Sequence, residues 1–516
     1  MGQIQQGVTD PLTQTAFDNS QAGVNQTTYP VVIVGQVLNA NPQPCALTAL
    51  FSKAQAINFA GAGSQLARMV SGYISNDLTA PIYVIPVADN SGASAAVYTM
   101  LITGVATGAG TWALRVAGYQ AFAGVITGQT AVQSAAAIVA AVNANANLPV
   151  VALAIAAADT TLRKVQFTAK NVGTIGNSIQ ITLNDGGLQN GESTPPGQSA
   201  TMAQPTMGAT DPDLVTANPI AAVLGDQKCR FLIHPYAGST GMGVFGGIMN
   251  ESTGRWASTR KSWGHCWTAE QGSPTTLASY GPSNDDPHST VLGYEAGARS
   301  MPDEAAAIFC GAQAASIRNQ PNLPTTNRPL IGFFGPPTWL SEANGGAFQK
   351  TTRNALEQLG LATIKYSVSG PAVSLCPTTY QFNTFGQPDQ SYFYTQTMYQ
   401  LMAIADAIDG METQEYSNTL LGDDGVAINP GIPFTSPALF KARMAQLAVT
   451  LQGQGLIQNV QAFVAASVAA RNSTAPGQLD TIWAPQLVVG LYQVTNLVQF
   501  RFYSAAAASA LIQAAA

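Results

Sequence analysis

Short runs of β-branched residues alternate with helical patterns in two separate stretches of this 516-residue chain. In the first stretch, apolar runs at 30–35 and 81–87 enclose helical patterns at 46–54 and 64–74. The second stretch begins at 213 and continues the alternation. Such alternation is typical of a parallel sheet covered by helices, because parallel strands need long crossover connections. The sequence therefore predicts one parallel α/β core built from two separate segments of the chain.

The residues between the two core segments have a different composition. From 93 to 185 the chain is rich in Ala, Thr, Gly and Val, with few charges. Strand-like runs surround a single helical pattern at 131–145, which predicts a small α+β domain inserted into the core. The segment 186–212 contains Pro195-Pro196-Gly197 and many small polar residues, a composition typical of a linker.

The C-terminal region carries two longer helical patterns, the first at 390–411. The second begins at Ser436 and Pro437, residue types that favour the N-cap and the first helical turn. Its apolar stripe has helical spacing and consists of Phe440, Met444, Leu447 and Leu451. The residues at 460–468 are predicted to be strand-like, and 486–503 to end in strands.

The predicted fold class is multidomain α/β and α+β, with extended arms at both ends. The second core segment is expected to include helices at 218–224, 246–258 and 302–319 and strands at 230–236, 265–270 and 289–294. The predicted divisions of the chain are an N-terminal arm (1–29), the first core segment (30–92), the inserted outer domain (93–185), a linker (186–212), the second core segment (213–377), a C-terminal α+β domain (378–490) and a C-terminal strand and tail (491–516).

Charged residues make up only 9% of the chain, where about 25% is usual. A surface with few ions is easily desolvated, which favours a subunit that packs against copies of itself. A secreted or surface protein with a polar, uncharged coat is the alternative. The net charge is −6 and no basic cluster occurs, so nucleic acid is not an expected partner.

The five cysteines are widely spaced and form no Cys-x-x-Cys pair. Neither a zinc site nor a disulfide framework is predicted, and free thiols indicate a reducing compartment. Residues 1–25 lack a basic region followed by an apolar one, so no signal peptide is expected. No apolar run of about 18 residues occurs, so neither a transmembrane helix nor a membrane partner is expected.

Two motifs resemble enzyme sites. Gly61-Ala62-Gly63 could belong to a dinucleotide loop, but that fingerprint needs its glycines directly after the first strand. Here the first strand ends near Gly35, so a tight turn before a helix is the favoured interpretation. His265 and Cys266 could suggest a Cys/His nucleophile. Adjacent strand residues point to opposite faces, however, and both are predicted to be core residues.

The remaining histidines do not suggest a site. His234 lies within an apolar run and His288 beside a proline. Three scattered histidines without a cluster of carboxylates predict no metal site. We therefore predict no catalytic, cofactor-binding or metal-binding residue, and no enzyme.

The segment 378–393 reads Thr-Thr-Tyr-Gln-Phe-Asn-Thr-Phe-Gly-Gln-Pro-Asp-Gln-Ser-Tyr-Phe. It resembles a signature of the Mu-like contractile tail sheath proteins of bacteriophages, in which a TTYQ-N-G-D-SY pattern leads into a long helix. Other patches resemble the same family in the expected order along the chain, at 61–69, 168–177, 218–236, 353–363, 423–425, 435–437, 455–459 and 498–502. Family members end near the position of Phe502, whereas this chain continues to Ala516.

The resemblance implies a structural subunit that forms six-fold rings or a helical lattice around a tail tube. Such a sheath shortens irreversibly without consuming a nucleotide and needs no cofactor. The implied partners are further copies of the chain, the tube protein, and baseplate and tail terminator proteins. The implied location is the virion, after assembly in the cytoplasm of the bacterial host. The inserted domain is expected to lie on the outer surface.

The two chain ends combine β-character with a terminal position, so we expect them to add strands to sheets of neighbouring subunits. The candidate residues for these strands are Asn25, Thr27, Tyr29, Leu497, Gln499, Arg501 and Tyr503. Three other interpretations stay open. They are the sheath of a tailocin or type VI-like machine, a bacterial surface-array or adhesin protein, and an enzyme with a dinucleotide-binding core.

Overall fold

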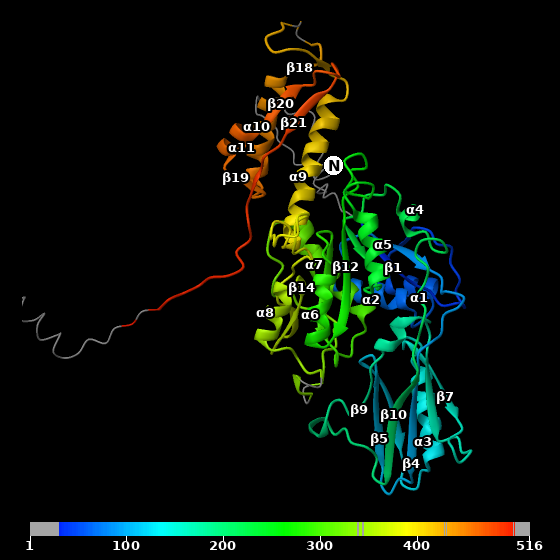
Figure 1. Ribbon diagram of the computed structural model, residues 1–516. Helices are drawn as coiled ribbons and strands as arrows, with labels where there is room; N and C mark the ends of the chain where they lie inside the picture. Colours follow the sequence, from blue (N-terminus) through cyan, green and yellow to red (C-terminus); the bar gives the residue numbers. More distant parts are fainter. Residues whose placement is uncertain are drawn as a thin grey trace, which may run out of the picture. The chain divides into compact units, whose positions relative to one another are not determined.

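A computed structural model describes residues 30–500 except 338–339, 343–344, 428, 430 and 499. The chain divides into two compact units, 1–419 and 420–516. Figure 1 follows the chain from the blue strands of the first unit to the orange and red elements of the second. The helix at the start of the predicted C-terminal domain belongs to the first unit.

Seven strands form the central sheet of the first unit (Figure 1). All neighbours are parallel except the last pair, which is antiparallel. The predicted mixed α/β class with a parallel core sheet is therefore confirmed. The order across the sheet is β14 (Leu361–Ala362), β13 (Ser289–Glu295), β12 (His265–Gly272), β11 (Phe231–Ile233), β1 (Val31–Gln36), β3 (Ile82–Val87) and β2 (Thr48–Leu50).

Helices cover both faces of this sheet, which explains why its strands are apolar at consecutive positions. Val31 and Ile33 face one helical layer, whereas Val32 and Val34 face the other. The first layer contains α1 (Lys53–Ala60), α2 (Gln65–Asn76) and α7 (Pro302–Asn319). The second layer contains α4 (Ile220–Leu224), α5 (Ser239–Met249), α6 (Pro274–Ser283) and α8 (Lys350–Gln358).

Two helix predictions in the core are wrong in position. The pattern at 46–54 contains the edge strand β2, and α1 starts only after Ser52, whose side chain accepts a hydrogen bond from the Gln55 amide. The predicted helix at 246–258 is displaced: the helix in this part of the chain is α5 (Ser239–Met249). Its glycines have low helix propensity and interrupt the apolar spacing by which a helix is predicted from sequence. After α5 the chain turns, because the Asn250 side chain accepts hydrogen bonds from following backbone amides.

Two small sheets and one helix form a module between β3 and α4 (Figure 1). Its elements are β4 (Val97–Gly104), β5 (Gly110–Val116), β6 (Tyr119–Val125), α3 (Ala131–Ala144), β7 (Val150–Ile155), β8 (Lys164–Ala169), β9 (Ile181–Leu183) and β10 (Gln198–Thr206). The order is β10-β4-β8-β7 in one sheet and β6-β5-β9 in the other. The segment predicted as a linker, 186–212, thus contains a strand, β10, which pairs antiparallel with β4.

The first unit ends with the hairpin of β15 (Ile364–Ser367) and β16 (Gly370–Val373), followed by the long helix α9 (Thr395–Tyr416). The sequence predicted that this helix begins at 390. It begins at Thr395 because the preceding residues form a loop closed by their own side chains.

The second unit is built around α10 (Pro437–Gly453). Ser436 caps it as predicted, with its Oγ accepting a hydrogen bond from the Leu439 amide, and the predicted apolar stripe is buried. The strand predicted at 460–468 is wrong, because 460–466 form helix α11 (Val460–Ala466). The strands are short and pair two by two: β17 (Leu420–Leu421) with β18 (Phe434–Thr435), β19 (Ile457–Gln458) with β22 (Gln486–Leu487), and β20 (Val468–Arg471) with β21 (Leu479–Ile482).

Candidate assembly surfaces

The C-terminal segment, residues 488–500, exposes its apolar side chains. Its described residues form no strand, so the strands predicted within 486–503 are confirmed only at β22. Leu497, one of the candidate residues, is 83% exposed. A run of exposed apolar side chains is typical of a surface that another chain covers. The exposed residues of the run are Val489, Leu491, Val494, Leu497, Val498 and Phe500.

The other candidates for linking strands lie outside the described residues. These are Asn25, Thr27 and Tyr29 at the N-terminus and Gln499, Arg501 and Tyr503 at the C-terminus. Their pairing stays a prediction.

The second unit offers edges to which a strand could be added. Each of its described sheets has only two strands, so each strand has one side without a neighbouring strand in its sheet. Two-stranded sheets are marginal alone, and free edges are templates for pairing with another chain. The unit thus combines open sheet edges with an apolar segment that no sheet of the described chain includes.

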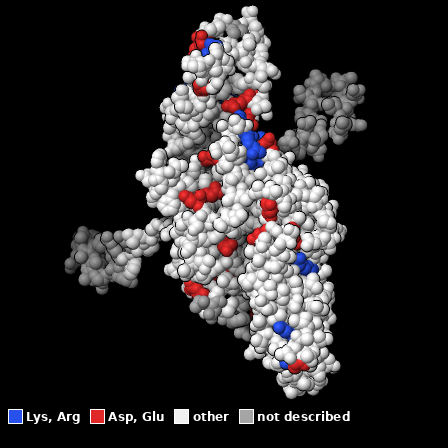
Figure 2. Space-filling model, turned by 45° about the vertical axis from the view of Figure 1, so that its right-hand side comes forward, with Lys and Arg blue, Asp and Glu red and all other residues white. Residues whose placement is uncertain are grey.

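Charges are few on the surface. Figure 2 shows one face on which Lys, Arg, Asp and Glu appear as small, separated groups. Burial of such a face against another protein strips few ions of water.

The segment predicted to carry the family signature forms a closed loop, residues 377–394, which we call the signature loop. The Thr378 hydroxyl donates a hydrogen bond to the carbonyl of Tyr392 (2.7 Å). The Thr379 hydroxyl donates to the carbonyl of Asp286 (3.0 Å), and the Thr379 amide donates to the carbonyl of Ser289 (3.0 Å). Both threonines are fully buried. Thr378 closes the loop on itself, and Thr379 fastens the loop to the start of β13.

The polar residues of the signature shape the far end of the loop. The Asn383 side chain accepts hydrogen bonds from the amides of Phe385 and Gln387 (both 3.0 Å). Asp389 accepts from the amide and hydroxyl of Ser391, and its other contact is the Tyr380 hydroxyl. Side chains that replace backbone partners in this way are typical of tight turns. The signature is therefore a structural device that sets where α9 begins.

Aromatic side chains anchor α9 to the central sheet. The indole Nε1 of Trp267 donates a hydrogen bond to the Tyr399 hydroxyl (2.8 Å), which itself donates to the carbonyl of Arg230 (3.1 Å). The Tyr399 ring stacks on Phe231 with centroids 4.9 Å apart. Further along the helix, an ion pair joins Asp406 to Arg230. The helix is thus held along one side by both packing and charge.

The crevice at the carboxyl end of β1 is filled by the inserted module. In open parallel sheets this is the usual place for a ligand. Here the Asn171 side chain donates to the carbonyl of Val37 (3.1 Å) and accepts from the amide of Gln65 (2.8 Å). The Gln36 side chain donates to the carbonyl of Val172 (3.0 Å). The chain itself supplies the polar partners that a ligand would need.

The glycines of the Gly61-Ala62-Gly63 motif serve this same junction. Both have positive φ angles, 91° and 79°. A Cβ on Gly63 would collide with the carbonyl oxygen of Leu148 in the inserted module. The turn before α2 therefore requires glycine for close approach of two backbones, as the tight-turn interpretation predicted.

Buried ion pairs surround the junction between the core and the inserted module. Asp303 pairs with Arg68, and Arg299 pairs with Asp185 of the module. Glu304, next to Asp303 in α7, accepts a hydrogen bond from the hydroxyl of Tyr119. Burial raises the pKa of Glu304 to about 7, although the Tyr119 hydrogen bond and the charge of Arg68 act in the opposite direction. No local sequence pattern indicates which distant residues these charged groups contact.

The stability contributed by Glu304 is expected to fall as the pH rises from about 5 to 7.5, whereas His234, His265 and His288, whose pKa values burial lowers from 6.5, contribute with the opposite sign. Folded Glu304 keeps its proton up to a pH near its raised pKa of about 7, whereas the unfolded chain loses it near 4.5. A pKa raised by folding stabilises the protein at low pH and no longer does so above that pKa. Each such group lowers the free energy of unfolding by about 1.4 kcal/mol per pH unit between its two pKa values.

Urea unfolding at several pH values measures this dependence. The free energy of unfolding of Glu304→Gln, relative to that of the parent chain, should therefore rise with pH between about 5 and 7. Glu270, whose pKa burial also raises to about 7, contributes with the same sign, so Glu270→Gln is a second variant. Identical pH profiles for the parent and both variants would contradict the assignment.

His265 and Cys266 are core residues, as predicted. Both are fully buried, and His265 Nε2 lies 2.7 Å from the Thr290 hydroxyl oxygen. The described residues of the chain hold no group of three His, Cys, Asp or Glu side chains suited to a metal ion. Within the same residues, no helix is both long and apolar enough to span a membrane.

Comparison with known proteins gives one relative that matches along nearly the whole sequence, although no family model matches. The chain is 27% identical over 497 residues to the Mu-like prophage FluMu tail sheath protein of Haemophilus influenzae, covering 95% of this chain and 97% of that protein. This match confirms the tail sheath resemblance. The signature loop is therefore the structural form of the sequence segment on which that resemblance rests.

Similar solved structures include three sheath proteins, all at low identity. The sheath tail protein of Desulfitobacterium hafniense is 10% identical, with a TM-score of 0.46, covering 93% of this chain and 100% of that one. The sheath tail protein of Listeria innocua is 10% identical with a TM-score of 0.46, covering 89% and 92%. A contracted sheath of an extracellular contractile injection system is 10% identical with a TM-score of 0.43, covering 96% and 98%.

Proposed function

We propose that the chain is the structural subunit of a contractile phage tail sheath. Copies polymerise around a tail tube and shorten to drive the tube through the host envelope. The single observation that carries this function is the match to a Mu-like tail sheath protein along 95% of the chain. It is a structural role and requires no catalysis.

The energy for shortening comes from contacts between copies. The crevice at the carboxyl end of β1, the usual place for a ligand in such a sheet, supports this source of energy. Asn171 and Gln36 use the polar groups there for internal hydrogen bonds, so a bound ligand is not needed to pair with them. The first unit, held together by buried ion pairs and by the anchors of α9, moves as one body. Better packing between such bodies in the shortened state drives the change.

The chain ends keep the copies connected during this movement. A strand added to an open edge of the second unit forms main-chain hydrogen bonds, each of which contributes about 0.5–1.5 kcal/mol. Such a link is independent of the surfaces of the globular bodies, so it persists while those bodies rotate. The exposed C-terminal segment and the two-stranded sheets of the second unit support this arrangement.

The partners of the proposed subunit are further copies of itself, a tail tube protein, and baseplate and tail terminator proteins. Its place is the virion, after assembly in the cytoplasm of the host cell. Negative-stain microscopy of the purified full-length chain tests the function. Hollow tubes of constant diameter are expected, whereas flat sheets or discrete particles would contradict it.

Removal of the inserted module is expected to leave assembly intact, because we place this module on the outside of the sheath. The structure suggests where to cut: the Ser94 amide donates to the carbonyl of Ala209 (3.1 Å), so a short Gly-Ser linker can replace 95–208. The shortened chain should form tubes of smaller outer diameter by negative stain.

The deletion also removes partners of the core. Arg299 loses Asp185, and Glu304 loses Tyr119. The deletion should therefore be combined with Arg299→Gln and Glu304→Gln, so that no buried charge is left uncompensated. A core that folds, as judged by circular dichroism, but no longer forms tubes would place the module within the assembly contacts.

A further inference from the structure

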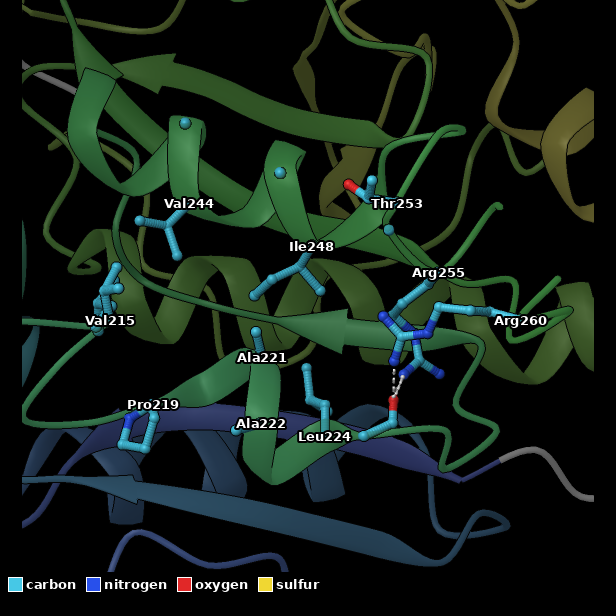
Figure 3. Close-up of a pocket in the computed structure, with 15 residues that line it drawn as sticks. Val215, Pro219, Ala221, Ala222, Leu224, Val244, Ile248, Thr253, Arg255 and Arg260 are labelled. Carbon is cyan, nitrogen blue, oxygen red and sulfur yellow. Dashed lines mark hydrogen bonds between the residues drawn. The ribbon is translucent and has the colours of Figure 1, made fainter. Parts of the chain in front are cut away.

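An apolar hollow lies between α4 and α5 in the first unit, and we call it the α4–α5 groove (Figure 3). Its volume is about 390 Å³, within the range of sites that hold a small ligand or a few side chains. A hollow of this kind accepts a bulky apolar side chain of another molecule. The side chains that define its walls are Val215, Ala222, Leu224, Val244 and Ile248.

Two exposed glycines keep the α5 wall of the groove low. Gly243 and Gly247 line the groove, and a Cβ added to either would meet no atom within 4 Å. Gly241 of the same helix differs, because a Cβ there would lie 2.3 Å from the carbonyl oxygen of Tyr236. Glycine weakens a helix relative to other residues. Gly243 and Gly247 therefore bring no benefit within the subunit, and we expect another molecule to approach the helix at this wall.

The two arginines at one end of the groove already have acceptors within the chain. Arg255 donates hydrogen bonds to the carbonyls of Gly225 and Gln227. Arg260 donates to the same Gly225 carbonyl (2.9 Å) and forms an ion pair with Asp226. Figure 3 shows both guanidinium groups directed at this carbonyl. The groove therefore does not call for an anion, and an uncharged occupant costs the least desolvation.

An exposed aromatic side chain of the first unit matches this apolar groove. Phe385 lies at the tip of the signature loop and is 86% exposed, so it contributes little to the fold of its own subunit. The tip is a tight turn in which the Gly386 amide donates to the carbonyl of Asn383 (2.8 Å) and Gly386 has a φ of 72°. Residues 382–388 carry no charge. An aromatic ring on a fixed, uncharged loop loses little conformational freedom on binding, as is typical of residues that dominate interfaces.

We propose that Phe385 of one copy inserts into the α4–α5 groove of a neighbouring copy. The signature loop and the groove share no residue, so each copy offers both halves of the contact. A contact between two different surfaces can repeat from copy to copy, which generates rings or helical filaments. The inference rests on the proposed function, since it requires neighbouring copies. It adds a contact between first units to the link that the terminal strands make.

The concentration at which the whole chain begins to polymerise measures this contact. Phe385→Ala should raise that concentration about tenfold to a hundredfold, as expected for the loss of one buried phenylalanine ring per contact. The matched control is Phe51→Ala, which removes another exposed ring (75%) and should polymerise like the parent. Pelleting at a series of concentrations measures all three chains. An unchanged concentration for Phe385→Ala, or an equal increase for both variants, would overturn the proposal.

Gly247→Leu fills the groove from its α5 wall and tests the other half of the contact. Since leucine favours a helix more than glycine does and a Cβ there meets no atom, the thermal unfolding midpoint, measured below the onset of polymerisation, should equal or exceed that of the parent. Polymerisation should nevertheless need an at least about tenfold higher concentration. The control is Gly124→Leu at an exposed position of β6, where a Cβ also meets no atom. Equal polymerisation by both variants would overturn the assignment to this groove.

Two single-cysteine variants show whether the contact joins different copies. Phe385→Cys and Gly247→Cys are made in separate chains, one with a size tag, mixed before assembly and treated with a short bis-maleimide. Four of the five native cysteines are buried, which limits background reaction. Covalent dimers with one chain of each kind are expected on a denaturing gel. A mixture with no more dimers than either variant alone would overturn the proposal. Mixed dimers from a chain that forms no tubes would instead refute the proposed function and support the contact.

Discussion

Truncation after Gly490 is expected to abolish polymerisation while leaving the subunit folded. The removed residues include Leu491, Val494 and Leu497, which are mostly exposed and bury little of their surface against the rest of the chain. The last described strand, β22, ends at Leu487 and stays in place. The truncated chain loses the strand that we assign to a neighbouring sheet, together with the residues that follow it.

Sedimentation velocity and negative stain measure the loss of tubes, and circular dichroism with thermal unfolding measures the fold. A chain that ends at Tyr503 is the matched control, because it keeps the candidate strand residues and lacks only the Ala-rich tail. It should still form tubes. Normal tubes from the chain that ends at Gly490 would refute the linking role of the C-terminal strand.

Trp267→Ala is expected to lower the free energy of unfolding by about 3–5 kcal/mol. Trp267 is completely buried, and its ring lies edge-on to Phe309 with centroids 5.0 Å apart. Its Nε1 also donates the hydrogen bond that holds Tyr399 of α9. The substitution leaves a cavity and removes an anchor of α9 at the same time.

Urea unfolding of the chain that ends at Gly490 measures this cost without interference from polymers. Tyr399→Phe keeps the stacked ring but leaves the buried indole without its acceptor, so about 1–3 kcal/mol is expected. Phe385→Ala removes an aromatic ring that is 86% exposed and should change stability by less than about 0.5 kcal/mol. Equal effects of Trp267→Ala and Phe385→Ala would contradict the role of Trp267.

The parallel core could be predicted because its strands are buried on both faces and are therefore apolar without interruption. Elements with weak local signals were missed or misplaced. The glycines of α5 weaken its helical signal. The small residues Ala, Ser and Thr in β10 give little strand signal, so its segment was predicted to be a linker. Helix α11 looks like a strand because Val460 and Val464 are β-branched, yet the Asn459 cap starts a helix there.

The signature at 378–393 could be found from the sequence, but its purpose could not. Its bonds reach Asp286 and Ser289, which are distant along the chain. The same holds for Asp303 and Glu304, whose partners Arg68 and Tyr119 come from another helix and from the inserted module. Charged residues within a buried helix were the one local signal, because such charges need partners.

We propose that each copy donates its C-terminal segment to the second unit of a neighbour. Cryo-electron microscopy of tubes formed by the full-length chain tests it most directly. We expect a hollow cylinder in which residues 497–503 of one copy lie as a strand against an open sheet edge of the next. A cylinder in which this segment returns to the sheets of its own copy, or a preparation that contains only monomers, would contradict it.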